Sequence, residues 1–354
     1  MNKKILLLFL LLFLTACQES NLSEDNTSIQ IDAYNDTNYS VEIPFDLSGA
    51  RKWHGDYLSK LDQIEIPKGL QEYSKDYFDV ADNFVRQGSL LDDDDVKMLQ
   101  RRESDEYPYA LNPELGAFEV DGTTTIESPY IVYDVVELDF VNQKTDELSG
   151  ISLAIIMNST VTSDGEEYSL SDDRLYTFAS VSGRKLELYL RTKEEVDPDL
   201  PNDITFYAAS DANSYVPGHY IGEGLFEGRS GQFSEISEQW LLVPSTAFSS
   251  YDTTLASSIS EMKSAINSFL PENVSMIGYA KYQDNDLSYL KINIVMQAKT
   301  YTEMYALAQY VNELSQSFIN NSFELVIMIS QNDEAVFSIT KPQGESQTTV
   351  NDLT

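Results

Sequence analysis

The sequence predicts an α+β protein in which helices pack on mixed, largely antiparallel sheets. Short β-rich segments occur along most of the chain, amphipathic helical segments interrupt them, and several neighbouring strands are separated only by a short polar turn. The composition, with 42% hydrophobic residues and 22 tyrosines, is that of a folded globular protein. A doubly wound parallel fold is disfavoured, because strands and helices do not alternate one by one.

Two helices are expected early in the chain. In 67–78, Pro67 precedes apolar residues at helical spacing, and in 92–103 four aspartates come before the apolar positions and two arginines after them. The run Asp92–Asp95 also suggests calcium. It lacks the glycine and the distal glutamate of a calcium loop, so we interpret it as a helix cap.

The middle of the chain continues with two strands and a long helix. Strands are expected in 130–140 and 151–161, and a helix in 172–191, with Asp172 or Asp173 as its cap. The segment 196–203 then carries two prolines among acidic residues. It is the best candidate for a linker between domains, and the alternative is a loop inside one domain.

The second half shows the clearest pattern. Its strands and helices are expected, in order, at 203–210, 218–228, 238–245, 255–271 (helix), 274–283, 287–297, 300–319 (helix), 323–330 and 335–340. A helix followed by strand-strand-helix-strand-strand therefore occurs at 92–227 and again at 255–340, which suggests two similar α+β domains. Different strand orders in the structure would reject this hypothesis. The predicted organisation is a signal peptide (1–16), a flexible tether (17–39), an N-terminal domain (40–197), a C-terminal domain (203–341) and a disordered tail (342–354).

The first residues read as an export signal. Lys3 and Lys4 give a positive start, Ile5–Leu14 is apolar without a break, and two small residues follow. A membrane-spanning helix needs about 20 apolar residues, so this stretch is too short to cross a bilayer, and no later stretch is longer.

The only cysteine, Cys17, follows directly. Leu14, Thr15, Ala16 and Cys17 resemble the lipobox of bacterial lipoproteins, which implies cleavage between Ala16 and Cys17 and a diacylglyceryl group on the sulfur. A lone thiol cannot form an internal disulfide, and the remaining alternative is a chance cysteine in a plain signal peptide. The expected partners are membrane lipid, bound through diacylglyceryl-Cys17, and the lipoprotein-processing enzymes. The expected location is the extracytoplasmic face of the cell membrane, where the acyl chains anchor the protein.

Charge and motif content exclude several functions. The formal net charge of −35 disfavours binding to nucleic acid. The two histidines, His54 and His219, lie far apart in sequence and have no further cysteine beside them, so we expect no metal site and no cofactor. The glycines of 222–228 lack the spacing of a phosphate-binding loop, and there is no G-x-S-x-G motif. We expect a non-enzymatic binding or envelope module. The alternative is a cell-envelope hydrolase acting on wall polymer, whose paired acids cannot be located among 58 carboxylates.

One segment combines aromatic residues, glycines and a histidine. It supplies a candidate ligand surface of Tyr215, His219, Tyr220, Gly222 and Gly224, whose ligand is unknown. The competing interpretation is a core strand preceded by a Pro-Gly turn.

Several blocks in the same order carry a family resemblance, from about residue 41 to 341. They are "EYSKDYF", "RQGSLLDDDDVKMLQRR" followed by "LNPELG", "NSYVPGHYIGEGLFEG", "WLLVPS", and "FLPENVSMIGYAKYQDNDLSYLKINIVMQ" followed by "ALAQYVNEL". The body resembles the CamS-like lipoproteins of Gram-positive bacteria, known as sex-pheromone precursor proteins. The resemblance implies an extracytoplasmic α+β lipoprotein whose discarded signal peptide is trimmed to a short apolar pheromone. Here that peptide would be "FLLLFLTA", Phe9 to Ala16. A transporter-associated binding lipoprotein is disfavoured, because those proteins have two lobes with parallel sheets.

Overall fold

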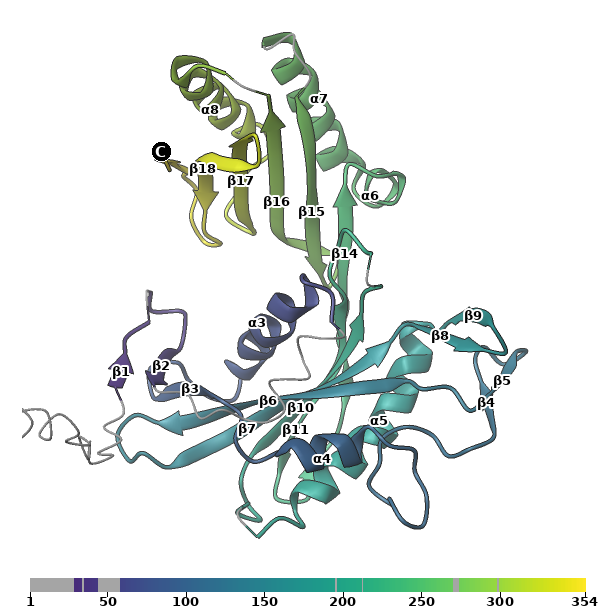
Figure 1. Ribbon diagram of the computed structural model, residues 1–354. Coiled ribbons are helices and arrows are strands. Elements are labelled where there is room, and N and C mark those ends of the chain that lie inside the picture. The colour runs from purple at the N-terminus through teal and green to yellow at the C-terminus, as the bar shows by residue number, and fades with distance from the viewer. Residues whose placement is uncertain are drawn as a thin grey trace, which may run out of the picture.

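The computed structural model describes residues 29–33, 35–43, 58–194, 196–211, 213–269, 274–297 and 299–354. This part of the chain forms two large mixed sheets with helices packed on them (Figure 1). The predicted α+β class, with largely antiparallel pairing, is therefore confirmed. The expected signal peptide, Cys17 and His54 lie outside the described residues.

The first sheet has nine strands in the order β1-β2-β3-β6-β7-β10-β11-β12, with β13 also paired to β11. Its strands are β1 (Ile29–Ile31), β2 (Ser40–Ile43), β3 (Asn83–Gln87), β6 (Val132–Asn142), β7 (Leu148–Asn158), β10 (Asn202–Ala209), β11 (His219–Glu227), β12 (Ser230–Gly231) and β13 (Ser234–Glu235). Two pairs, β2–β3 and β7–β10, are parallel and the others are antiparallel.

The second sheet has six strands in the order β14-β15-β16-β17-β18-β19. They are β14 (Glu238–Val243), β15 (Ser275–Gln283), β16 (Asp286–Met296), β17 (Glu324–Gln331), β18 (Glu334–Lys341) and β19 (Thr349–Asp352). Only β16–β17 is parallel. The hairpin predicted at "DND" is confirmed. Asp284 and Asn285 both have positive φ, as the tight turns that match strand twist require.

Six helices and two small two-stranded sheets complete the described fold. The helices are α3 (Asp62–Ser74), α4 (Asp93–Leu99), α5 (Asp172–Leu190), α6 (Thr246–Tyr251), α7 (Thr253–Phe269) and α8 (Tyr301–Ser315). The small sheets are β4 (Ala117–Glu119) with β5 (Thr125–Glu127), and β8 (Thr160–Ser163) with β9 (Glu166–Ser169). Figure 1 shows both small sheets at one end of the long strands β6 and β7.

Three apolar clusters hold the sheets and helices together. On one face of the first sheet, α4 and α5 pack on residues such as Ile155 and Phe206, and on the other face α3 packs on Tyr207 and its neighbours. The second sheet buries one face, around Ile292, under α7 and α8. Burial of apolar area is the main stabilising term in each cluster.

The change from the first sheet to the second comes later than the predicted boundary at 198–202. Ile236 N bonds Ile221 O of the first sheet, and Ser237 O accepts from Asp284 N of the second. The segment 196–203 is a loop between α5 and β10, held by bonds from Arg191 to its carbonyl groups. It is therefore a loop inside one unit, because the strand that follows it pairs centrally with β7. We call residues 29–236 the N-terminal region and residues 237–354 the C-terminal region.

The predictions for both ends of the body need correction. The tail 342–354 is not wholly irregular, because β19 extends the second sheet by pairing with β18. Part of the expected tether is also ordered. β1 pairs with β2, and buried Tyr39 donates its hydroxyl hydrogen to the carbonyl oxygen of Phe78. In both cases a short strand in a largely polar segment pairs with its neighbouring strand in the chain.

The two sheets share one topology. The series β3-β6-β7-β10-β11-β12 and β14-β15-β16-β17-β18-β19 have the same neighbours and the same pairing directions throughout. In each sheet a crossover helix joins the parallel pair, α5 in the first sheet and α8 in the second. The connection between the first two strands of each series also contains helices, α4 in the first sheet and α6 and α7 in the second, and these pack on the same face as the crossover helix. Different strand orders would have rejected the hypothesis of two similar units, and the strand orders of the two sheets are the same.

Candidate ligand pocket

The five residues of the predicted ligand surface do not share one surface. Tyr215 is 73% exposed in the segment before β11, whereas Tyr220 is buried beneath α3, donates its hydroxyl hydrogen to Ile66 O and contacts the rings of Tyr73 and Tyr207. Burial raises the pKa of the Tyr220 phenol, with nearby Glu238 adding to the shift. Tyr220 is therefore a core residue and cannot contact a ligand at the surface.

Gly222 and Gly224 have a packing role. A Cβ added to Gly222 would lie 2.7 Å from the ring of Tyr176 and 2.8 Å from that of Phe206, and one added to Gly224 would lie 2.7 Å from the backbone oxygen of Gln232. The glycines thus let α5 and the chain before β13 approach the sheet closely. This agrees with the competing interpretation of the segment as a core strand.

His219 pairs with the first residue of α5. Its Nε2 lies 3.0 Å from Oδ2 of Asp172, and the hydrogen bond lowers the pKa of that carboxyl. The cap of α5 is Ser171 rather than Asp172 or Asp173, since the Ser171 hydroxyl accepts from Arg174 N. Asp172 is therefore available to His219, and the contact fixes a helix end to the start of β11.

A pocket of about 620 Å³ opens at another place, beside the carboxyl ends of the parallel strands β7 and β10. Its lining residues come from four segments: Lys97 and Gln100 from α4 and its end; Tyr130, Val132, Tyr133 and Asp134 from the start of β6; Asn158, Ser159 and Thr160 from the end of β7; and Ala209, Ser210 and Asp211 from the end of β10. In doubly wound parallel sheets ligands bind outside the carboxyl ends of the strands. In this largely antiparallel sheet the pocket lies at the same end of the parallel pair β7–β10.

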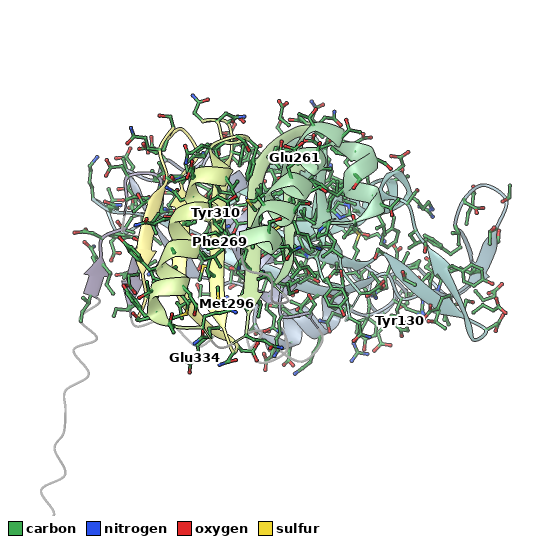
Figure 2. All side chains as sticks on the ribbon, turned by 90° about the horizontal axis from the view of Figure 1, so that it is seen from above. Tyr130, Glu261, Phe269, Met296, Tyr310 and Glu334 are labelled. Carbon is green, nitrogen blue, oxygen red and sulfur yellow. The ribbon has the colours of Figure 1, made fainter. Side chains whose placement is uncertain are left out.

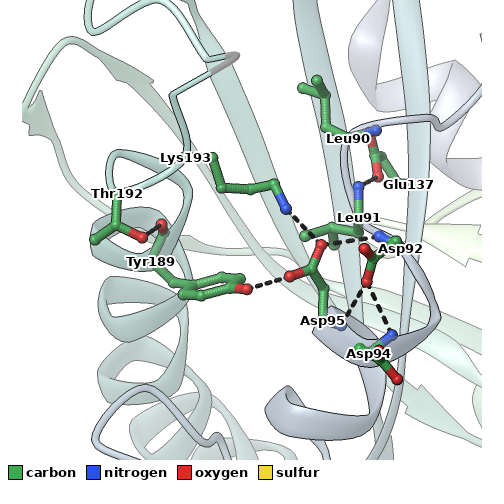
Figure 3. A network of polar contacts seen from close by, with 9 residues as sticks. All are labelled: Leu90, Leu91, Asp92, Asp94, Asp95, Glu137, Tyr189, Thr192 and Lys193. Carbon is green, nitrogen blue, oxygen red and sulfur yellow. Dashed lines mark hydrogen bonds and ion pairs between the residues drawn. The ribbon is translucent and has the colours of Figure 1, made fainter.

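The wall that α4 provides is anchored at the helix start. Asp92 caps the helix by accepting from Asp94 N and Asp95 N at 2.9 Å, and its own N–H donates to Oδ2 of Asp95. The aspartate run therefore caps a helix, as predicted. Asp95 also accepts from Tyr189 and Lys193 at the end of α5 (Figure 3). Burial alone would raise the pKa of Asp95, but these hydrogen bonds hold it below its usual value.

The loop before α4 is held by two buried carboxyl groups of β6. Glu137 accepts from Leu90 N at 2.9 Å and from Leu91 N at 2.8 Å (Figure 3), and Asp139 accepts from the amide and the hydroxyl of Ser89. Burial raises the pKa of both carboxyls, and the nearby Asp139 adds to the shift of Glu137. The pair fixes the path of the chain into the α4 wall.

Asn112 joins the end of α4 to the start of β6. It is fully buried, its Oδ1 accepts from Ile131 N and Val132 N, and its Nδ2 donates to Val132 O and Gln100 O. An amide whose donors and acceptor are all used in this way fixes the two segments relative to each other. Two walls of the pocket are therefore preformed.

The end of β10 is fixed to the start of α3 by Asp62. This buried carboxylate accepts from Ser210 N at 3.0 Å and from its hydroxyl at 2.8 Å, and also from Tyr207 Oη and Gly218 N at 2.7 Å. Burial, together with the charges of Asp62 and Asp134, raises the pKa of Tyr133. Tyr133 lines the pocket, and its hydroxyl, which is protonated at neutral pH even without this shift, is a hydrogen-bond donor.

A second pocket of about 550 Å³ lies next to the first, and Tyr130 lines both. The remaining residues of this pocket include Arg101, Arg102, Tyr107 and Leu115. Within the described parts of the chain, no cluster of three or more His, Cys, Asp or Glu side chains could hold a metal ion. None of the helices described here is long and apolar enough to span a bilayer.

Sequence reasoning missed the pocket residues. They are spread from residue 97 to residue 211, and none belongs to a catalytic or binding motif. One signal was present in the chain. Polar residues follow directly on β7 (Asn158, Ser159, Thr160) and on β10 (Ser210, Asp211), the two strands that the crossover helix makes parallel. Recognising it would have required the strand pairing, which periodicity does not give.

Comparison with known proteins agrees with the fold. Residues 45–347 match the family model described as "CamS sex pheromone cAM373 precursor". Comparison with curated protein sequences gives no match. A solved sex pheromone precursor from Lactobacillus salivarius subsp. salivarius UCC118 superposes with a TM-score of 0.79 at 20% identity, over 92% of this chain and 99% of that one. The C-terminal domain of the sex pheromone staph-cAM373 precursor from Staphylococcus aureus superposes with a TM-score of 0.67 at 18% identity, over 83% of this chain and 97% of that one.

At these identities the solved structures establish a shared fold. The family match covers most of the chain and includes every helix of the described residues and all the described strands of both sheets except β1, β2 and β19. On this evidence, the chain belongs to the CamS sex pheromone precursor family.

Proposed function

We propose that this protein is a lipid-anchored extracytoplasmic binding protein. Cys17 carries the diacylglyceryl group, and the folded body binds a ligand in the pocket beside α4. The lipobox Leu14–Cys17 and the family membership support the anchor. The observation that carries the binding role is the pocket at the carboxyl ends of β7 and β10, whose walls are fixed by buried polar contacts before any ligand arrives.

The arrangement of carboxyl groups favours binding over hydrolysis. Glycoside hydrolysis uses two carboxyl groups that face each other across the scissile bond, one with a raised pKa. Of the five described carboxyls with a raised pKa, Glu137, Asp139 and Asp203 are buried in the fold and Glu65 and Glu223 are partly buried, and none of the five lines the pocket. In the pocket, buried Asp134 accepts from Val135 N and lies 3.5 Å from Gln100 Nε2. The body therefore acts without catalysis in this proposal.

The signal peptide has a separate role in the same proposal. Cleavage before Cys17, followed by trimming, releases Phe9–Ala16, "FLLLFLTA", as a hydrophobic sex pheromone. The peptide is uncharged in its side chains and ends in a small residue. Family membership supports this step, because the family is described by its pheromone precursor.

Mass spectrometry of the mature N-terminus and of the culture medium tests the anchor and the peptide together. We expect diacylated Cys17 in the membrane fraction and an apolar octapeptide in the medium. The variant Cys17→Ser should lose both the modification and the membrane retention. Synthetic FLLLFLTA should trigger a response in a cognate recipient. Full-length, unacylated chain in the cytosol would contradict the anchor, and silence across recipients with diverse conjugative plasmids would contradict the pheromone.

A further inference from the structure

Tyr130 is the residue on which the two pockets meet. It precedes β6, its side chain is 59% exposed, and it lines both pockets. Figure 2 shows it at the outer surface of the N-terminal region, far from Phe269 on α7 and Tyr310 on α8. Aromatic side chains are common in the lining of ligand pockets, where they supply a large apolar face.

The Tyr130 ring is held in place by Arg102. The guanidinium carbon lies 3.8 Å from the ring centroid, and the guanidinium group donates to Pro129 O at 2.9 Å, to Pro113 O at 3.3 Å and to Ser128 O. Arg102 lines only the second pocket, so the ring keeps an open side toward the first. A ring fixed in this way loses little conformational entropy when a ligand stacks on it.

The walls of the first pocket suit a ligand rich in hydroxyl groups. Gln100, Asn158, Ser159 and Thr160 offer amide and hydroxyl groups that both donate and accept hydrogen bonds. The only aliphatic lining residues are Val132 and Ala209. Asn158 Nδ2 and Ser159 Oγ already donate to Tyr130 O and Ala209 O, but their oxygens can still accept hydrogen bonds. An acyl chain or an apolar side chain could not donate to these oxygens, at a cost of about 1–3 kcal/mol for each acceptor that it buries unpaired.

The charges of the two pockets disfavour an anionic ligand. The first pocket is lined by one lysine, Lys97, and two aspartates, Asp134 and Asp211. The second is lined by two arginines and three acidic residues, Glu103, Asp105 and Glu114. Neither pocket therefore has an excess of positive charge, which binding a polyanion such as a polyol phosphate would require.

We infer that the two pockets form one groove for an uncharged oligosaccharide chain, with one sugar ring stacked on Tyr130. The apolar C–H face of a sugar ring packs against the face of an aromatic ring, and its hydroxyls pair with the amide and hydroxyl groups of the walls. The chain continues across Tyr130 into the second pocket. This inference rests on the proposed binding function and names its ligand class.

Titration calorimetry on the mature chain, kept in detergent micelles, tests the inference. The probes are the N-acetylglucosamine tetramer, cellotetraose and a linear polyglycerol phosphate. We expect at least one neutral tetrasaccharide to bind wild type, with about tenfold weaker binding by Tyr130→Ala and unchanged binding by Tyr130→Phe, because the ring face and not the hydroxyl makes the contact. Tyr215→Ala is the matched control, since it removes an exposed tyrosine outside both pockets and should bind like wild type.

The outcomes separate the inference from the proposed function. If polyglycerol phosphate binds in a Tyr130-dependent way and neither neutral sugar does, the ligand class is wrong while the pocket still binds. If the sugars bind equally to wild type and Tyr130→Ala, the stacking role is wrong. If none of the three probes binds, the inferred ligand class is rejected. The pocket-filling variant Ser159→Trp tests the binding function itself. If every probe that binds wild type binds this variant equally well, the pocket is not the binding site and the proposed function fails.

Discussion

The two regions share a topology and differ in what is added to it. In the N-terminal region the connection from β7 to α5 contains the β8–β9 hairpin, and the connection from β3 to β6 contains α4, β4 and β5. In the C-terminal region the connection from β16 to α8 has only residues 297–300. The pocket lies at the end of β7, beside the β8–β9 hairpin, and Thr160 of β8 is one of its lining residues. The proposed binding site therefore adjoins an insertion at one end of the common sheet.

The regions also differ in how their second face is covered. In the N-terminal region α3 covers the face opposite α5, whereas the corresponding face of the second sheet carries half-buried residues such as Tyr279, Tyr289 and Lys291. α3 approaches the second sheet through a few contacts: Lys68 lies 5.0 Å from the ring centre of Tyr289, and Tyr73 bonds Glu238 and Gln283. The N-terminal region thus has two apolar clusters and the C-terminal region one, so we expect the N-terminal region to be the more stable.

One buried carboxylate joins the two regions. Glu238 accepts from Tyr73 Oη at 2.8 Å and lies 2.9 Å from Lys281 Nζ, and its other oxygen accepts from Trp240 Nε1 and Tyr220 N. Tyr73 and Tyr220 belong to the N-terminal region, and Trp240 and Lys281 to the C-terminal region. We therefore expect the contacts of Glu238 to make the N-terminal and C-terminal regions unfold together.

Glu238→Ala should have the largest effect. It leaves the largely buried Lys281 ammonium and the Tyr73 hydroxyl without their partner, which typically costs about 3–5 kcal/mol for a buried ion pair. We expect calorimetry to show two unfolding transitions, and hydrogen exchange to speed up in β14–β19 before the first sheet. Glu238→Gln should fall between wild type and alanine, and the exposed Glu235→Ala is the control. A single undivided transition in Glu238→Ala would show that the regions are coupled by other contacts.

A change of pH should affect the two regions unequally. Among the described residues, every carboxyl with a raised pKa lies in the N-terminal region: Glu65, Glu137, Asp139, Asp203 and Glu223. In the C-terminal region hydrogen bonds lower the pKa of Glu303 and Asp352. When the native pKa of a carboxyl is raised, the native state still holds a proton at pH values between the unfolded and the native pKa, where the unfolded state has released it. Stability from these groups is therefore full below about pH 4 and is lost as pH rises through their native pKa values.

Glu137→Gln tests this difference. The amide keeps the volume and removes a buried charge, so the fall in stability between pH 4 and 8 should become shallower, by about 1.4 kcal/mol for each unit of pKa shift that is lost. Urea unfolding at several pH values measures the slope. Asp95→Asn is the control of opposite sign, because the lowered pKa of Asp95 gives stability that is lost as pH falls below about 4. An unchanged slope in Glu137→Gln would place the pH response outside the Glu137–Asp139 pair.

Local signals predicted the elements well. The hairpin at Asp284–Asn285, the aspartate cap of α4 and the amphipathic helix α8 all follow from residues close together in the chain, so periodicity and turn chemistry specify them. The family resemblance was confirmed for the same reason, since it rests on continuous blocks.

Features that depend on distant partners could not be predicted. The prolines around residue 200 suggested a domain boundary, yet Asn202–Ala209 is a central strand because β7 pairs with it. The sequence placed Tyr220 on a candidate ligand surface, but α3 covers it in the fold. The pocket is lined by residues up to more than 100 positions apart in the sequence, and no local sequence pattern predicts that they lie close together.

The smallest effect on stability is expected at β19, the last strand of the second sheet. β19 corresponds to β12 in the shared order, and its Asp352 accepts a hydrogen bond from Tyr301 Oη, the first residue of α8, at 2.5 Å. Because this contact is exposed, Tyr301→Phe should leave the melting temperature almost unchanged. We expect faster amide exchange confined to 349–352, measured by hydrogen-exchange mass spectrometry. Tyr305→Phe is the control, since Tyr305 is a similarly exposed tyrosine one turn along α8. Equal exchange in both variants would mean that backbone pairing with β18 alone holds the strand in place.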